Sequence, residues 1–326
     1  MPHYGCRIAV LVALVAVGVC GCSQGTTTAR KRLSIATGGT GGVFYPYGGA
    51  IARVISENLE SVEATAEVTG ASVDNLKFIK QGTSDLALTM ADTAQDAVAA
   101  RDAFSDFGAV PARALAVLYP SYVHLVTRDG SGIARVADLR GRLVSIGSPG
   151  SGTAILAQRI LEAAGLAPGR DLRTQSLGVA QSVDALKDGK VDAFFWNGGL
   201  PTAAIVDLVN TPGITARFVA TEDVLRPLQQ KYGPSLYYRE VIPAATYGAD
   251  TDTPVVGVAN LLVVSESMDE QLAYDITRLL FEKQADLIAV HPEAKKLSLQ
   301  TALVGSPIPF HPGAIRFYSE RQVWKE

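Results

Sequence analysis

The sequence predicts an α/β fold with two lobes, and the main observation behind this is a repeated segment. Residues 79–88 and 186–195 each contain a helix end, a glycine, an aspartate and an apolar strand, with equal spacing from glycine to aspartate. A glycine-rich loop that opens a helix precedes each copy, at residues 38–42 and at residues 147–153. Ligands bind at the carboxyl ends of strands in open parallel sheets. The two similar halves therefore predict two lobes that hold a small molecule between them.

The first 32 residues are interpreted as a leader and a tether. Arg7 precedes an apolar run over residues 8–19, which is too short to span a bilayer but has the length of a secretory signal core. The run ends in a segment that resembles the lipobox of bacterial lipoproteins, so residues 1–22 are a signal peptide and Cys22 becomes the lipidated first residue. Residues 23–32 form a polar tether. We expect an extracytoplasmic protein, anchored to the cytoplasmic membrane by lipid.

The composition of the chain argues against several classes of partner and site. All three cysteines lie in the leader, so the body has no thiol for a disulfide, a metal site or a nucleophile. A hydrophobic content of 48% and a charged content of 19% indicate a globular body. The net charge of −3, without a basic patch, argues against nucleic acid as a partner. The four histidines lack ligand spacing, and we expect neither a metal nor a cofactor.

The first half alternates strands and helices. Ala50, Ile51, Val54 and Ile55 recur at helical spacing, which predicts one buried helix face. The expected order is a strand at 33–36, a helix with Pro46 near its first turn, a strand at 62–68, a helix capped by Ser72 and ending at Gly82, a strand at 86–88, a helix capped by Asp92 or Thr93, and strands at 114–118 and 123–127 that Pro120 separates.

The second half runs similarly and then returns to the first lobe. The expected order is a strand at 143–146, a helix at 153–164, a strand at 193–196, a helix opened by Pro201, a helix at 222–231, strands at 237–242 and 255–264, and helices from Asp269 onward. The apolar strand at 255–264 is long enough to pass between lobes, and we pair it with 123–127 as the two crossings. Lobe I then comprises 33–122 and 258–326, and lobe II comprises 123–257.

The glycine loops do not match the enzyme motifs that they superficially resemble. Phe44 stands where a dinucleotide fingerprint needs its third glycine, and the loop at 147–153 lacks the lysine of a phosphate-binding loop. No Gly-x-Ser-x-Gly elbow surrounds Ser151. No acid–base or nucleophilic pair can be recognised, so we predict a protein that is not an enzyme.

The loops offer hydrogen-bond donors instead. Glycines let the backbone approach a ligand closely, and the free N–H groups at a helix start favour an anion. Thr40, Ser148, Ser151 and Thr153 add hydroxyl groups. Because neither loop contains an arginine, an anion is expected to bind mainly to neutral donors and helix ends.

Several segments resemble one known family. The run from Gly38 to Ala50 is similar to the N-terminal signature of the TAXI family, the extracytoplasmic solute receptors of TRAP transporters. Residues 147–153, 192–201 and 307–320 resemble further motifs of that family, in the same order. The resemblance implies a type II periplasmic-binding-protein fold, with two α/β lobes joined by a hinge of crossing strands. It also implies capture of a small carboxylate or amino acid, such as glutamate or 2-oxoglutarate, and its delivery to an integral-membrane TRAP permease.

The resemblance also implies a set of ligand contacts. One member of this set, Asp92, has an alternative role: we expect it to cap a helix and not to contact an ammonium group of the solute. The set comprises Gly39, Thr40, Tyr45, Met90, Ala91 and Asp92 from the first lobe, Ser148, Gly150, Ser151, Gly152 and Thr153 from the second, and Trp196, Asn197 and Gly198 closing over the solute.

Two other functions remain open. A receptor for an ABC importer shares the fold and the anchor, and a periplasmic sensory binding protein is a third class. Neighbouring genes separate the first two, because a large fused permease indicates a TRAP system and an ATPase indicates an ABC importer.

Overall fold

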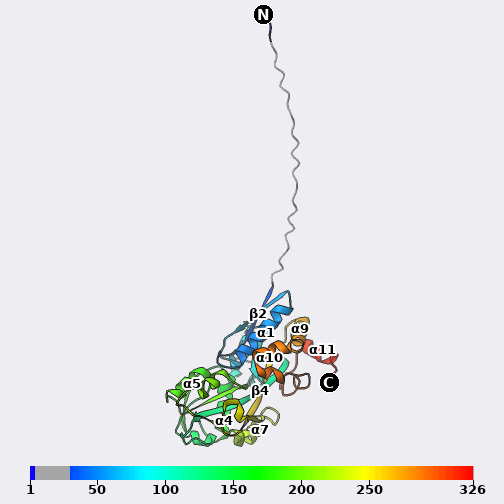
Figure 1. The fold of residues 1–326 in the computed structure, drawn as a ribbon. Helices are drawn as coiled ribbons and strands as arrows, with labels where there is room; N and C mark the ends of the chain where they lie inside the picture. The colour runs from blue at the N-terminus through cyan, green and yellow to red at the C-terminus, as the bar shows by residue number, and fades with distance from the viewer. Residues whose placement is uncertain (4–29, 326) are drawn as a thin grey trace.

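Two lobes share one mixed sheet in the computed structural model, which describes residues 1–3 and 30–325. In this part of the chain the strand order is β2-β1-β3-β10-β4-β7-β5-β6, with β8 beside β4 and β9 beside β10. Figure 1 shows helices α1, α9, α10 and α11 around the upper lobe and α4, α5 and α7 around the lower one. The two-lobed α/β architecture with crossing strands is therefore confirmed.

The bounds of the elements follow the alternation expected from the sequence. The strands are β1 (Lys31–Ala36), β2 (Val62–Glu67), β3 (Leu86–Met90), β4 (Ala112–Arg128), β5 (Leu143–Ser145), β6 (Arg173–Gln175), β7 (Ala193–Gly198), β8 (Ala216–Val219), β9 (Tyr238–Ile242) and β10 (Thr253–Ser265). The α-helices are α1 (Phe44–Asn58), α2 (Ser72–Gln81), α3 (Ala91–Val98), α4 (Gly152–Ala163), α5 (Val179–Lys187), α6 (Ala203–Val209), α7 (Leu225–Tyr232), α8 (Ala244–Tyr247), α9 (Glu270–Glu282), α10 (Gln284–Val290) and α11 (Pro312–Glu320). The short 3-10 helices are η1 (Asp102–Phe104), η2 (Val136–Leu139), η3 (Glu222–Val224) and η4 (Pro292–Lys296).

The repeated segment forms the same structure in both lobes. Gly82 and Gly189, which follow α2 and α5, both have φ of 70°, a conformation that favours glycine. The next aspartates bind the first strand of their lobe, because Asp85 Oδ2 accepts from Ser34 N at 2.9 Å and Asp192 Oδ2 accepts from Leu143 N at 2.7 Å. Strands β2, β1 and β3 run parallel in the first lobe, and β6, β5 and β7 run parallel in the second. The parallel strands therefore direct their carboxyl ends, and the glycine loops, toward the space between the lobes.

The crossing strands are longer than predicted. β4 and β10 are antiparallel neighbours, and each extends from one lobe into the other. Pro120 lies within β4, so the predicted break into two strands is wrong. Its register partner is Ala259 on β10, whereas β7 pairs with β4 only from Tyr122 onward. A strand can accommodate a proline on an unpaired side, because proline has no N–H to donate.

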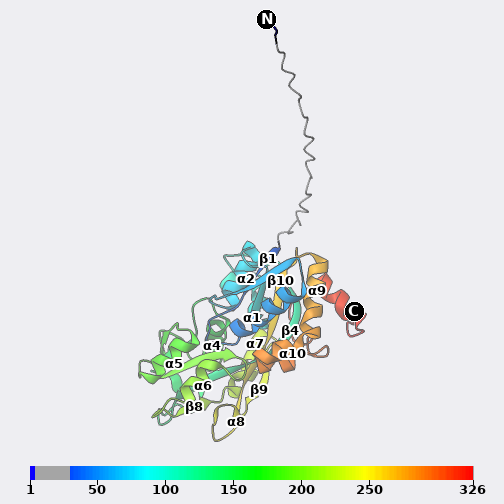
Figure 2. The ribbon, with the colours of Figure 1, turned by 45° about the horizontal axis from the view of Figure 1, so that its top comes forward.

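The C-terminal helices pack on the first lobe, where α9 lies beside α1 and β4 (Figure 2). Ala114 of β4 donates to the Pro309 carbonyl at 2.9 Å, and His311 N donates back to Ala114 O at 2.9 Å. The lobe boundaries at 122/123 and 257/258 stay a prediction.

The N-terminal predictions mostly concern residues outside the described part of the chain. The signal peptide and Cys22 lie there, as does most of the tether, although β1 already begins at Lys31. Among the described residues, none of the helices is long and apolar enough to cross a membrane.

Candidate functional site

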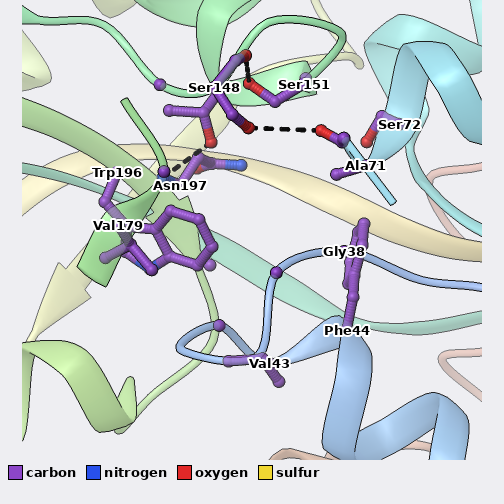
Figure 3. A pocket seen from close by; sticks show the side chains of 18 of the residues that line it. Gly38, Val43, Phe44, Ala71, Ser72, Ser148, Ser151, Val179, Trp196 and Asn197 are labelled. Carbon is purple, nitrogen blue, oxygen red and sulfur yellow. Dashed lines mark hydrogen bonds between the residues drawn. The ribbon is translucent and has the colours of Figure 1, made fainter. Parts of the chain in front are cut away.

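A cavity of about 170 Å³ lies between the lobes, at the carboxyl ends of the parallel strands. Its walls come from the loop between β1 and α1, the loop between β2 and α2, the loop between β5 and α4, and the ends of β3 and β7 (Figure 3). The lining residues are Gly38, Gly39, Gly42, Val43, Phe44, Thr69, Gly70, Ala71, Ser72, Met90, Tyr119, Gly147, Ser148, Ser151, Gly152, Thr153, Gly178, Val179, Gln181, Trp196, Asn197 and Gly198.

Nine of the fourteen residues expected to contact the solute line this cavity. They are Gly39, Met90, Ser148, Ser151, Gly152, Thr153, Trp196, Asn197 and Gly198. The other five lie elsewhere: Thr40, Tyr45, Ala91, Asp92 and Gly150 are not part of the lining. Tyr45 is 36% exposed, and the Gly150 carbonyl accepts from the N–H groups of Val73 and Asp74, so this glycine joins the second lobe to the start of α2.

The start of α4 presents unused donors to the cavity. Ser151 is the N-cap, and its Oγ accepts from Ala154 N at 3.1 Å. The N–H groups of Gly152 and Thr153, which open the helix, have no partner among the described residues. Thr153 Oγ1 instead accepts from Asn197 N at 3.3 Å, which joins the helix start to the end of β7. Such a helix start favours an anion.

The loop before α2 holds a strained residue at the cavity wall. Ala71 has φ of 87° and ψ of −146°, a conformation that costs a residue other than glycine about 1–3 kcal/mol. Its N–H donates to Thr69 Oγ1, and Thr69 donates to the buried Asn75 side chain. Ser72 is not the cap of α2 that the sequence predicts. It is the first helical residue, and its Oγ accepts from Met90 N at 3.1 Å.

Trp196 lies between two glycines, one from each lobe. A methyl group added at Gly42 or at Gly198 would lie 2.7 Å from the indole ring. Gly42 is therefore needed for the first lobe to approach the indole ring, and Gly198 is needed for the ring to lie along its own strand. The indole Nε1 donates to Thr202 Oγ1 at 2.9 Å, which fixes the plane of the ring.

A chain of hydrogen bonds continues from Thr202 away from the cavity. Thr202 N donates to Tyr247 Oη at 2.9 Å, and Tyr247 Oη lies 3.2 Å from His124 Nε2. His124 Nδ1 donates to the Tyr122 carbonyl at 2.9 Å. Burial lowers the pKa of His124 to about 4, so the ring is neutral at pH 7 and its Nε2 accepts from Tyr247. These contacts position Trp196 indirectly.

Two buried polar atoms at the cavity lack partners among the described residues. They are Asn197 Oδ1 and Tyr119 Oη, and their side chains belong to residues that are 7% and 2% exposed. Burial, with smaller repulsion from Glu293 and Tyr47, raises the pKa of Tyr119 well above its usual value. The phenol therefore keeps its proton and remains a hydrogen-bond donor.

Asp92 belongs to a buried ionic cluster away from the cavity. It is neither the cap of α3 nor a lining residue, because α3 has no side-chain cap. Its Oδ2 accepts from Tyr237 Oη at 2.9 Å and lies 3.8 Å from Arg159 Nη1. Burial raises the pKa of Asp92, and the Arg159 cation opposes this shift. The cluster joins α3 of the first lobe to α4 of the second.

A second contact between the lobes lies on the side of η4. Leu200 N donates to Glu293 Oε1 at 2.6 Å, and the Pro201 carbonyl lies 3.2 Å from His291 Nε2. Glu293 is 2% exposed and its Oε2 lies 3.0 Å from Lys296 Nζ. Burial raises the pKa of Glu293, while Lys296 and the Leu200 N–H oppose the shift.

The sequence did not indicate several of the lining residues. Tyr119 is in the middle of β4, where the apolar pattern of a buried strand hides a cavity contact. Phe44 belongs to the motif at 38–50, and in the sequence it argues only against a dinucleotide site. Ala71 and Ser72 lie at the start of α2, where the sequence signals only a helix cap.

Comparisons with known proteins give the family and the fold. The sequence profile of the NMT1-like family matches residues 35–321. An ancestral arginine-binding protein bound to arginine is 14% identical, with a TM-score of 0.50, covering 82% of this chain and 96% of that one. A protein from Bordetella bronchiseptica RB50 is 17% identical, with a TM-score of 0.50 and coverage of 88% of both chains.

The alkanesulfonate-binding protein SsuA from Xanthomonas axonopodis pv. citri, bound to MOPS, is 17% identical with a TM-score of 0.48, covering 91% of this chain and 96% of that one. At these identities structural similarity gives the fold alone. The predicted periplasmic-binding-protein fold is confirmed.

Proposed function

This chain belongs to the NMT1-like family, and from that premise we propose that it is an extracytoplasmic solute receptor that binds a small organic acid between its lobes. The observation that carries the proposal is the cavity at the strand ends, where the unused N–H groups of Gly152 and Thr153 open α4. Glycine loops and a helix start are the features that such a fold uses to bind an anion. A binding function without catalysis accords with this fold.

The second part of the proposal concerns the type of permease that receives the solute. The motifs at 38–50, 147–153, 192–201 and 307–320 favour a TRAP-type permease, with the receptor lipidated at Cys22. The alternatives are the receptor of an ABC importer and a sensory binding protein, since these share the fold. The gene beside this one distinguishes the importers, because only an ABC system needs an ATPase.

Closure around the solute can be tested at Gly42. Gly42→Ala places a methyl group against Trp196, so the lobes can close only if the indole ring moves. We expect affinity for the bound acid to fall about tenfold or more, because overpacking of this kind costs about 1–3 kcal/mol. The measurement is calorimetric titration with the acid that responds best in a thermal-shift panel containing glutamate, 2-oxoglutarate and other small carboxylates.

Gly49→Ala is the matched control. It lies in α1, the helix that follows the loop containing Gly42, and its added methyl group would meet nothing within 4 Å. Its affinity should equal that of the unchanged protein. Equal affinity in both variants would place binding outside the space between Gly42 and Trp196, and the proposal would be wrong.

A further inference from the structure

We infer that the solute is a monocarboxylate: one acid group on an uncharged, apolar body about the size of a benzene ring, without an ammonium group or a second acid group. This inference rests on the proposed function and narrows its substrate class. It excludes glutamate and 2-oxoglutarate, which the family resemblance implies. Three properties of the cavity carry it, namely its charge, its donors and its size.

The cavity wall carries no ionisable acid or base among the described residues. Its side chains are aliphatic, aromatic, hydroxyl, amide or thioether groups, apart from the Tyr119 phenol, which burial keeps protonated. The charged side chains near the cavity either pair with other residues or lie outside its lining. Arg159 pairs with Asp92, Asp96 and Asp102, and Asp74 faces the backbone of Gly70 and Gly150.

An ammonium group in this cavity would have no carboxylate partner. Transfer of an unpaired charge out of water costs several kcal/mol, so a zwitterion such as glutamate would lose more on desolvation than it regains. The same reasoning applies to a second carboxylate that finds no donors. The wall therefore selects against an amino acid.

A single carboxylate in the cavity would find hydrogen-bond donors. The N–H groups of Gly152 and Thr153 open a helix of 12 residues, and its dipole adds positive potential at this end. Tyr119 also lines the cavity, and its hydroxyl has no partner among the described residues.

Asn197 supplies the observation, independent of the helix, that a polar ligand group is expected here. Its side chain projects toward the same space, is buried and leaves Oδ1 without a partner (Figure 3). Its Nδ2 contacts only the Met90 sulfur, at 3.2 Å, and sulfur is a weak acceptor. The amide Nδ2 carries two N–H groups and has this sulfur as its one partner among the described residues, so it keeps donor capacity for a carboxylate.

The other helix start at the cavity is less suited to a second acid group. α1 presents the side chains of Val43 and Phe44 there, and Pro46 removes one donor from its first turn. The first amides of α2 are already used, because Val73 and Asp74 donate to Gly150 O. A dicarboxylate would therefore place its second group against apolar side chains.

The size and the walls define the body of the solute. A cavity of about 170 Å³ is close to the ~150 Å³ of an engineered apolar cavity that binds benzene. Phe44 and Trp196 lie on opposite sides of the space in Figure 3, and Val179 and Ala71 add aliphatic surface. A ring or a chain of about five carbons fits between these walls.

The test uses ligands that differ by one group, measured by calorimetric titration on the full mature chain. Pentanoate, glutarate and glutamate share a five-carbon chain, and benzoate and benzamide share a ring. We expect pentanoate and benzoate to bind, and glutarate, glutamate and benzamide each to bind at least tenfold more weakly than their monocarboxylate counterpart. Phe44→Ala should weaken benzoate about tenfold, whereas the control Tyr45→Ala, at the exposed neighbouring position, should not.

The alternatives give different results. If glutarate or glutamate binds more tightly than pentanoate, and Gly42→Ala weakens that binding, the monocarboxylate inference is wrong and the receptor function stands. If benzamide matches benzoate, the acid group is not recognised and the inference is also wrong. If no member of either series binds and the protein retains no small molecule on purification, the receptor function itself is overturned.

Discussion

His124 of β4 is buried and belongs to the chain of hydrogen bonds that positions Trp196. Both ring nitrogens have partners, the Tyr122 carbonyl and the Tyr247 hydroxyl, and neither partner carries a charge. Phe218 packs edge-on against the ring, at a centroid distance of 6.3 Å. The protonated form is therefore disfavoured by desolvation, and its Nε2 proton would displace the Tyr247 hydroxyl hydrogen.

This arrangement predicts a pH dependence of folding stability. The pKa of His124 is about 4 in the folded protein and 6.5 in a model peptide, so the unfolded chain binds more protons between these values. Stability is then complete above pH 6.5 and falls as the pH drops toward 4, by roughly 3 kcal/mol for this group. Denaturant melts of the unchanged protein and His124→Gln at pH 7, 6, 5 and 4.5 measure the difference in slope.

Two other histidines also contribute to the pH dependence of stability, so they provide a comparison for His124. Burial also lowers the pKa values of His291 and His311, so part of the pH slope remains in His124→Gln. His311→Gln should accordingly flatten the slope less than His124→Gln does. A slope that is unchanged in His124→Gln would show that the ring is not buried and neutral in the folded protein.

At the scale of elements, α3 and α4 join the lobes through Arg159. Its guanidinium contacts Asp96, lies 2.6 Å from Asp102 and 3.8 Å from Asp92, and donates to Tyr237 Oη at 2.9 Å. The Arg159, Asp92 and Asp96 side chains are buried, so their contacts are shielded from solvent, whereas Asp102 is exposed. α4 thus presents its first residues to the cavity and its middle residue to the acidic side chains of the first lobe.

Removal of this cation should destabilise the protein strongly. Arg159→Met leaves the carboxylates of Asp92 and Asp96 buried without their partner, and breaking a buried pair in this way costs about 3–5 kcal/mol. Denaturant melts at pH 7 give the change in unfolding free energy. Arg135→Met is the control, because its pair with Asp138 is 71% exposed on the arginine side and should contribute less than about 1 kcal/mol.

A compensated variant separates lost charge from lost packing. Arg159→Met combined with Asp92→Asn and Asp96→Asn removes the unpaired charges and should recover part of the lost stability. If Arg159→Met alone were as stable as the Arg135→Met control, the cluster would not hold α3 and α4 together.

The elements also show what the sequence can and cannot indicate. Local signals predicted the repeat correctly, because the glycine stop and the following aspartate act within one turn and one neighbouring strand. Pro120 misled the prediction, since its effect depends on which strands lie on either side of β4. Asp92 misled it as well, because its partners Arg159 and Tyr237 are 67 and 145 positions away along the chain.

At the scale of the whole molecule, three groups of contacts outside the cavity lining join the lobes. They are the bonds from α2 to Gly150, the Arg159 cluster and the bond from Leu200 to Glu293. Residues of the cavity wall join the lobes as well, because Ser148 Oγ donates to Gly70 O at 3.4 Å and Asn197 Nδ2 lies 3.2 Å from the Met90 sulfur. The glycine loops of this wall can be seen in the sequence, whereas Tyr119, Ala71 and Val179 become part of it only because the fold brings distant segments together.

The most direct test of the central claim is mass spectrometry of the small molecules that the mature protein carries through native purification. The account predicts one small organic acid in near-equal amount to the protein, retained by Gly49→Ala and largely lost from Gly42→Ala. Recovery of the same compound in equal amounts from both variants would contradict it, because the molecule would then be bound somewhere other than between Gly42 and Trp196.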